Sequence, residues 1–200
     1  MIYTTDMLVN KFNAYTNPKA KIKRMCNNNE LLHICQGLYD DNLRPSLFRL
    51  HAYIYGPSYV SFRFALSYYN LIPEFNLNVS CATYGKNKRK DYDTSIGYIY
   101  YQDVPKQVYP YGVKTINMNG YVYRMATPEK ALCDYLYSDN YKLESESDFK
   151  DYLFEDLRID IEEFENLDFE FIVKIAPLYK RKNLDYLVNY IIKEGLYAVL

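Results

Sequence analysis

Residues 17–39 read NPKAKIKRMCNNNELLHICQGLY. The stretch opens with Asn17-Pro18: asparagine is a favoured N-cap, and proline suits the first helical position because its missing N–H would have no partner there. At 100° per residue, one arc of the following helix is apolar and consists of Ile22, Met25 and Cys26. The opposite face is polar and carries Lys23, Arg24 and Asn27, with Lys19 and Lys21 at its flanks. We therefore predict a short amphipathic helix over 18–28 with a basic outer face.

A hairpin follows this helix directly. Asn29 can end the helix, because asparagine tolerates the left-handed conformation better than most residues. Residues 31–34 then read as a strand, 35–37 as a turn and 38–39 as a returning strand. Before the basic helix, residues 4–15 show helical spacing, with Thr5 or Asp6 as the N-cap.

The predicted order of helix, turn, basic helix and hairpin is that of a winged helix-turn-helix, whose second helix enters the major groove of DNA. A basic helix on the solvated surface of an ordinary domain has the same pattern. The pattern alone leaves both interpretations open.

The remainder of the chain predicts a second domain over 46–200, after a polar linker at 40–46. Segments 77–84, 95–101, 112–118 and 120–125 alternate as strands do, with a turn at 85–90 and a hairpin at Asn119-Gly120. Segment 47–55 fits a helix or a strand. Helices are expected over 59–71, 128–137, 147–157 and 184–195, with another near 160–175. The predicted fold class is α+β: a winged helix-turn-helix (1–43), then a mixed α/β domain with a strand-rich middle (77–125) and a helical C-terminus (127–200).

Charge is unevenly distributed along the chain. The net charge of −1 over 200 residues predicts no general attraction to nucleic acid. Residues 1–39, however, hold five basic and two acidic side chains, and residues 139–170 hold 13 acidic and three basic ones. Because fields act over roughly 8–10 Å in cellular salt, this asymmetry is more informative than the total.

Few residues suggest catalysis, metal binding or disulfide formation. The four cysteines form no C-x-x-C pair, which favours reduced thiols over a disulfide framework or a zinc site. No nucleotide-binding or hydrolase motif occurs, so we expect no cofactor, no metal and no enzymatic activity. His33 is expected to be structural.

A basic cluster falls in a loop between strands and is either a solvated turn or a second contact for nucleic acid or an acidic partner: Lys86, Lys88, Arg89 and Lys90. No apolar run approaches the ~20 residues that span a bilayer, and no signal-peptide core is present, so a cytoplasmic protein without a membrane partner is expected.

Two longer motifs point to a family. GPSYVSFRFALSYYNLIPE (56–74) and YRMATPEKALCDYLY (123–137) together resemble the AbiEi-type antitoxins, which are transcriptional regulators of type IV toxin–antitoxin and abortive-infection modules. NELLHICQGLYDD (29–41) is similar to that family's wing. The resemblance covers roughly residues 4–138, with Asn29 where the family often has glycine and Gln36 where lysine or arginine is common.

The resemblance implies a function. The first domain would bind repeats in its own promoter, as a homodimer on those repeats, and repress the operon. The second would counteract a nucleotidyltransferase-type toxin, without necessarily binding it stably. Glu129 and Lys130, in the motif at 123–137, suggest a catalytic role. The favoured interpretation is structural: they stand at the start of a helix, where an acidic side chain suits the helix dipole.

The residues expected to bind DNA follow from side-chain chemistry. Phosphates would be contacted by Lys19, Lys21, Lys23 and Arg24, base edges by Arg24, Asn27 and Asn28, and the wing tip would contribute Gln36. Three alternatives stay open. In the first, toxin antagonism by 46–200, aided by the acidic segment 139–170, is the principal activity. In the second, the chain is a winged-helix regulator without a toxin. In the third, it is an enzyme that reverses the toxin's modification.

Overall fold

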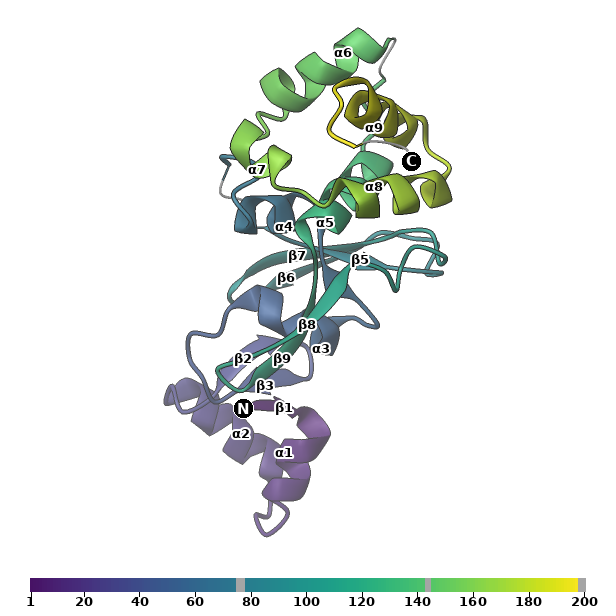
Figure 1. The fold of residues 1–200 in the computed structure, drawn as a ribbon. Coiled ribbons are helices and arrows are strands. Elements are labelled where there is room, and N and C mark those ends of the chain that lie inside the picture. The colour runs from purple at the N-terminus through teal and green to yellow at the C-terminus, as the bar shows by residue number, and fades with distance from the viewer. Residues whose placement is uncertain (75–77, 143–144, 198–200) are drawn as a thin grey trace.

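The computed structural model describes residues 1–74, 78–142 and 145–197. The chain is a mixed α+β protein whose elements form three regions along one long axis (Figure 1). The N-terminal unit lies at one end, a mixed sheet occupies the middle, and a group of helices forms the other end. The predicted α+β class is therefore confirmed.

The N-terminal unit begins with a strand that was not predicted. Its elements are β1 (Ile2–Thr4), α1 (Thr5–Lys11), α2 (Pro18–Asn27), β2 (Leu32–Cys35) and β3 (Leu38–Asp40). The three strands form an antiparallel sheet in the order β1-β3-β2. The helix expected over 4–15 is shorter, and its N-cap is Thr4 rather than Thr5 or Asp6, because the Thr4 side chain accepts a hydrogen bond from the Met7 N–H.

The central sheet has six strands in the order β6-β7-β5-β4-β9-β8. Their bounds are β4 (Tyr59–Val60), β5 (Val79–Thr83), β6 (Lys90–Thr94), β7 (Gly97–Asp103), β8 (Val113–Met118) and β9 (Tyr121–Ala126). The β5/β7 and β4/β9 pairs are parallel, and the others are antiparallel. The predicted Asn119-Gly120 hairpin is confirmed, and both residues have the positive φ that such a tight turn requires.

Two predictions for the middle of the chain were wrong. Tyr59 and Val60, expected in a helix, form β4 at the centre of the sheet, and helix α4 begins only at Phe62 (Phe62–Tyr68). Lys90, expected in a turn, opens the unpredicted strand β6. Segment 47–55 is helical, as the 3-10 helix η1 (Leu47–Leu50) and α3 (His51–Ile54). Leu77, at the start of one predicted strand, lies outside the described residues.

The C-terminal part is helical, as predicted, in its described residues. Its elements are α5 (Pro128–Ser138), α6 (Glu146–Asp151), the π-helix η2 (Tyr152–Asp156), α7 (Ile161–Glu165), α8 (Phe169–Ile175), the 3-10 helix η3 (Ala176–Tyr179) and α9 (Lys182–Lys193). Thr127 caps α5 by accepting from the Lys130 N–H. Two helices, α7 and α8, lie where a single helix was expected near 160–175. The second begins because the Asp168 side chain accepts a hydrogen bond from the Phe171 N–H. No helix in the described ranges has the length and apolar character needed to cross a bilayer.

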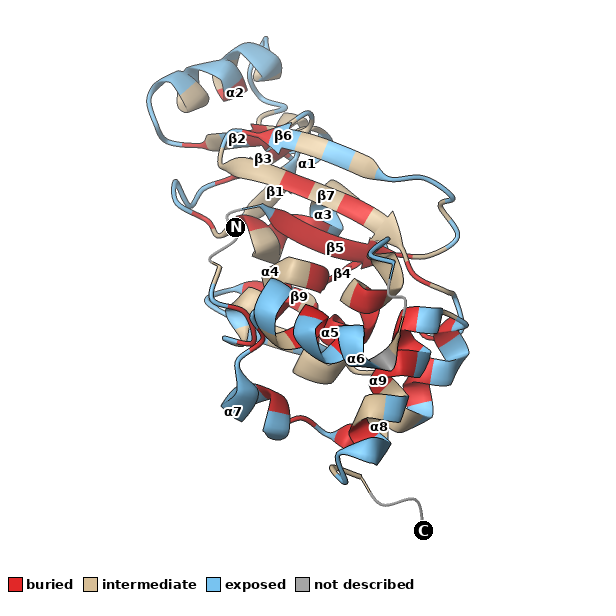
Figure 2. Cartoon of the chain, turned by 90° about the horizontal axis from the view of Figure 1, so that it is seen from above, coloured by how far each residue is buried: buried red, intermediate tan, exposed pale blue. Residues whose placement is uncertain are grey.

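Apolar side chains fill both faces of the sheet. The C-terminal helices, with α4 and α5, build the larger core on one face, and η1 packs into a second core on the other. Strand β5 is buried along its whole length (Figure 2). Its two polar side chains are satisfied by hydrogen bonds, because the Ser80 hydroxyl donates to the Ser61 carbonyl and the Thr83 hydroxyl donates to Asp103 Oδ1, each at 2.7 Å.

The N-terminal unit is joined to the sheet by buried contacts. Asp40 is fully buried and accepts hydrogen bonds from the Tyr121 hydroxyl of β9 (2.7 Å) and the Asn42 N–H (2.9 Å). The Ser95 N–H, in the β6–β7 turn, donates to the Ile34 carbonyl at 3.0 Å. A small apolar cluster seals the junction and contains Ile34, Leu38, Leu50 and Tyr121. The orientation of the β2–β3 hairpin is therefore fixed by the sheet.

A second buried carboxylate connects the sheet to the helices. Asp134 of α5 accepts from Lys130 Nζ (2.7 Å) and from the hydroxyls of Tyr59 (2.9 Å), Ser61 (2.7 Å) and Tyr179 (2.6 Å). All five side chains are buried. Burial raises the pKa values of the Tyr59 and Tyr179 hydroxyls well above the usual value for tyrosine. Both hydroxyls therefore stay protonated and able to donate hydrogen bonds. Lys130 is thus an internal ion-pair partner, in line with the structural interpretation of its motif.

We predict that Asp134→Ala lowers the free energy of unfolding by about 3–5 kcal/mol, because it leaves the Lys130 ammonium buried without its carboxylate. Tyr59→Phe removes one donor of several and should cost only about 1–2 kcal/mol. Urea unfolding at pH 7 measures both. The double variant Lys130→Met/Asp134→Leu should lose clearly less stability than Asp134→Ala; equal losses would contradict an ion-pair role.

His51 is a fully buried residue whose neutral form is fixed by its neighbours. The Ser58 hydroxyl donates to the Tyr55 carbonyl (2.8 Å), so it must accept from His51 Nδ1 (2.7 Å). His51 Nε2 in turn accepts from the Arg124 N–H at 3.3 Å. Burial, assisted by the positive charge of Arg124, lowers the pKa of His51 to about 3. The imidazole therefore remains uncharged in the folded protein at neutral pH.

We predict that stability falls as the pH drops below 6.5. The unfolded chain binds a proton at His51 near pH 6.5 while the folded chain does not until about pH 3, so this contribution is complete above pH 6.5 and is lost progressively below it. Between pH 7.5 and 5 the loss should be about 2 kcal/mol. Urea unfolding of the protein and of His51→Gln at both pH values tests this. The variant should be less stable at pH 7.5 yet lose less on acidification, and parallel pH profiles would contradict the prediction.

Candidate nucleic-acid interface

Helix α2 forms where the sequence predicted it, through the same local interactions. The Asn17 side chain accepts from the Ala20 N–H at 3.1 Å, and Pro18 occupies the first turn. At the other end, Asn29 has a φ of 55°, and the N–H groups of Asn29 and Glu30 bond back to the Cys26 and Met25 carbonyls. This is a Schellman ending, with asparagine in place of the usual glycine.

The predicted apolar arc of α2 faces the core of the N-terminal unit. Ile22 is buried in a cluster with Leu8 of α1 and Leu31, and Met25 and Cys26 pack at its edge. Lys19, Lys23, Arg24 and Asn27 are exposed. The helix therefore presents its basic side chains to solvent.

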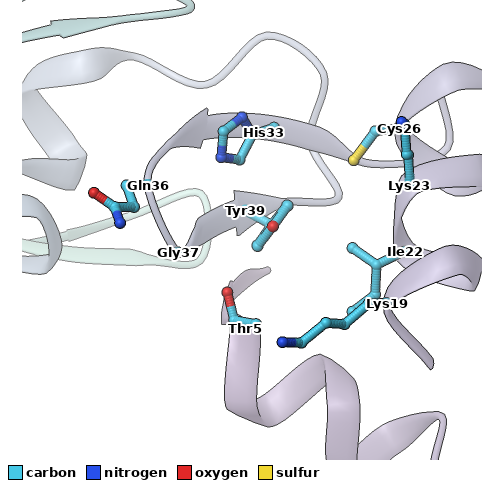
Figure 3. A pocket seen from close by; sticks show the side chains of 9 residues that line it. All are labelled: Thr5, Lys19, Ile22, Lys23, Cys26, His33, Gln36, Gly37 and Tyr39. Atoms are coloured by element: carbon cyan, nitrogen blue, oxygen red, sulfur yellow. The ribbon is translucent and has the colours of Figure 1, made fainter. Parts of the chain in front are cut away.

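A cleft of about 580 Å³ separates α2 from the β2–β3 hairpin (Figure 3). Lys19, Lys23 and Cys26 line the helix side. The hairpin side contains His33, Gln36, Gly37 and Tyr39, and α1 adds Thr5. Three of the predicted DNA-binding residues, Lys19, Lys23 and Gln36, thus line the same cleft.

The other predicted residues lie elsewhere on the helix. At 100° per residue, Lys21 and Arg24 fall on the flank away from the cleft. The Lys21 ammonium sits 5.9 Å from the centre of the Tyr15 ring. The Asn28 side chain donates to Glu30 Oε1 at 3.0 Å, so its amide already has a partner.

The basic side chains of α2 form no ion pair within the described part of the chain. The ion pairs found there involve other residues, and none includes Lys19, Lys21, Lys23 or Arg24. An unpaired surface cation keeps its full charge for an incoming anion, whereas a paired one must first give up its partner.

Cys26 and His33 both line the cleft, a pairing that could suggest metal binding or nucleophilic chemistry. Burial raises the pKa of the Cys26 thiol, which disfavours the reactive thiolate. The His33 ring packs against Tyr39, with 5.0 Å between ring centres, and its backbone carbonyl accepts from the Ser95 hydroxyl. Within the described ranges, no three His, Cys, Asp or Glu side chains group closely enough to hold a metal.

Thr5, His33 and Tyr39 line the cleft but were not predicted to be part of it. Tyr39 lies between the buried Leu38 and Asp40 on β3, so strand alternation could have placed it on the open face. Thr5 had no such signal, because its position depends on the unpredicted strand β1.

The basic cluster of the β5–β6 loop is largely engaged by its own neighbours. Lys86 Nζ donates to the Gly56 carbonyl and lies 5.1 Å from the centre of the Tyr55 ring. Arg89 pairs with Asp91 at 3.1 Å and stacks on Tyr100. Lys88 is exposed. The loop is at the end of β6 away from Ser95 and the hairpin, about 15 Å along a five-residue strand, so these cations do not extend the α2 surface.

The acidic segment 139–170 lies at the opposite end of the molecule from α2 (Figure 1). Some of its carboxylates cap helices, namely Asp148, Asp160 and Asp168. Others are exposed around η2 and α7: Glu155, Asp156, Glu162, Glu163 and Glu165. Glu144 and the side chain of Glu146 lie outside the described residues. The molecule is therefore electrically polar, basic at α2 and acidic around α7.

Comparison with known proteins finds no matching family model and no significant match to a curated protein. The family resemblance carried by 56–74 and 123–137 thus stays a prediction.

Proposed function

We propose that the chain is an antitoxin that binds its operator DNA through a winged helix-turn-helix at 1–43, represses its own operon, and counteracts a nucleotidyltransferase-type toxin through 46–200. The observation that carries the DNA-binding part is the exposed, unpaired basic face of α2 beside a hairpin. A helix pair followed by a hairpin is the order in which winged helices supply a recognition helix and a wing.

The positions of the predicted residues support different roles for them. Lys19 and Lys23 line the cleft between helix and wing, where a phosphate strand would pass. Arg24 and Asn27 lie on the exposed outer face of α2 and are suited to guanine and adenine edges. Gln36 offers a neutral amide at the wing tip, and Asn28 must leave Glu30 before it can bind a base.

The charge distribution supports one docking orientation. A polyanion is attracted to the α2 end and repelled by the exposed carboxylates at the α7 end (Figure 1). The protein's net charge of −1 then matters little, because each field decays within about a Debye length.

The antitoxin part rests on the family resemblance together with the structure of its motifs. Residues 56–74 and 123–137 meet at Asp134, through Tyr59, Ser61 and Lys130. Because Lys130 is fully buried and ion-paired, it is unsuited to act on a substrate. This favours a regulator over an enzyme that reverses the toxin's modification. A cytoplasmic location is part of the same proposal.

Removing cleft cations should weaken operator binding and its salt dependence. For Lys19→Ala/Lys23→Ala we predict that the slope of log K against log salt becomes shallower by about 2, since each lysine releases about 0.9 counterion. Fluorescence anisotropy with the gene's own upstream DNA at several salt concentrations measures this. Lys114→Ala/Lys193→Ala removes two exposed charges elsewhere and should leave the slope unchanged. Equal affinity of the wild-type protein for unrelated DNA would refute operator recognition.

Toxin antagonism should survive loss of DNA binding. Deleting 1–43 would expose Leu50 and Tyr121, so the full chain carrying Lys19→Ala/Lys23→Ala is the better test. Expressed from an independent promoter with the adjacent nucleotidyltransferase gene, it should protect cells as well as wild type at equal protein levels. Loss of protection would tie antagonism to DNA binding. Failure of the wild-type protein to protect would leave a winged-helix regulator without a toxin.

A further inference from the structure

A second basic cleft lies within the helical end of the molecule. Its volume is about 820 Å³, and it is formed by two segments far apart in sequence, 140–142 after α5 and 180–183 at the start of α9. Four of its lining side chains are basic: Lys142, Lys180, Arg181 and Lys182. The described lining contains no carboxylate. Clefts of this size accommodate small-molecule ligands.

Hydrogen bonds hold the two walls together. Arg181 donates from one guanidinium nitrogen to the Asp139 carbonyl and to Asn140 Oδ1, each at 3.1 Å. The buried Asn183 amide, on the same segment as Arg181, donates to the Tyr141 carbonyl at 3.5 Å. The cleft is therefore preformed, and a ligand would not have to order its walls.

Two of the four cations of this cleft are free of the contacts that engage the others, since Arg181 holds the walls and the Lys182 ammonium lies 5.2 Å from the centre of the Tyr186 ring. Lys142 and Lys180 are exposed, one on each wall, and neither takes part in an ion pair within the described ranges. Helix α9 starts at Lys182 without a side-chain cap, and Asp185 in its first turn offsets part of the positive potential of its first N–H groups. Four positive groups around one cavity are the arrangement that binds polyphosphate.

One wall also offers an aromatic ring. Tyr141 lines the cleft and is 46% exposed, and its ring stacks on Tyr152, with 4.5 Å between ring centres and an interplanar angle of 29°. A ring held in this way is a platform for a nucleobase, and stacking on such rings contributes about 1–3 kcal/mol per base.

The surroundings favour a compact anion over a nucleic-acid strand. The cleft belongs to the end of the molecule that carries the exposed carboxylates of η2 and α7, which would repel an extended phosphate backbone. A single polyphosphate concentrates its charge within reach of the four cations. We propose that this cleft binds a nucleoside triphosphate, with its phosphates on Lys142, Lys180, Arg181 and Lys182 and its base on Tyr141.

Isothermal titration of the full-length protein with ATP and GTP tests the proposal, with inorganic triphosphate and single-stranded RNA of about ten nucleotides as comparison ligands. Lys142→Gln/Lys180→Gln removes one charge from each wall without touching Arg181. Lys150→Gln/Lys193→Gln removes two exposed charges elsewhere in the helical end and is the matched control. Unchanged thermal unfolding midpoints would show that both variants are folded.

We expect one triphosphate per chain, bound at least about tenfold more weakly by Lys142→Gln/Lys180→Gln and unchanged in the control. Tyr141→Leu should weaken ATP or GTP but not inorganic triphosphate. Absence of binding at millimolar nucleotide, or equal binding by the cleft variant, would overturn the proposal. Preference for RNA over nucleotide, or no effect of Tyr141→Leu, would overturn the nucleotide assignment. Operator binding by Lys142→Gln/Lys180→Gln should be normal, so the outcome is independent of the function proposed for α2.

Discussion

The buried carboxylate of Asp134 is the constraint on which the larger part of the structure depends. An ionised carboxylate removed from water is costly unless several donors surround it, and here the donors come from three separate parts of the chain. Tyr59 and Ser61 belong to β4 and the start of α4, Lys130 shares α5, and Tyr179 ends η3. Satisfying this one group therefore requires the sheet, the helix that crosses it and the C-terminal helices to be in place together.

A second buried carboxylate, Asp40, has the same effect on the N-terminal unit. Its bond to Tyr121, together with the bond from Ser95 to Ile34, fixes the β2–β3 hairpin against the sheet. The hairpin in turn fixes one wall of the cleft beside α2. The two junctions together place the basic helix and the acidic helices at opposite ends of one body (Figure 1). The charge polarity of the protein follows from the sequence, and these two junctions fix the ends that carry it relative to one another.

Helix α2 and several turns could be predicted because local capping and turn residues determine them. Strands that depend on pairing with distant segments were difficult to predict. Asn17, Asn29, Thr127 and the Asn119-Gly120 turn each act on backbone groups a few residues away, so the sequence alone located their elements. Strands β1, β4 and β6 depend on partners distant in sequence, and β1 and β4 are too short to show an alternating pattern. The α2 cleft was partly predictable: Lys19, Lys23 and Gln36 were identified, but not Thr5 or Tyr39. The second basic cleft could not be predicted, because its cations lie in two segments far apart in sequence. One of these segments lies inside the acidic stretch 139–170.

A β2–β3 hairpin fixed by buried hydrogen bonds has consequences for the proposed recognition of DNA. Binding then orders few new groups, so most of the contact energy from Lys19, Lys23 and the outer face of α2 appears as affinity. The cost is adaptability, because the hairpin cannot move relative to the central sheet without breaking the bonds made by Tyr121 and Ser95. The helical end, meanwhile, faces away from DNA docked on α2 (Figure 1) and stays open to other ligands. Under the proposed function, operator binding at α2 would therefore not block toxin antagonism by the helical end.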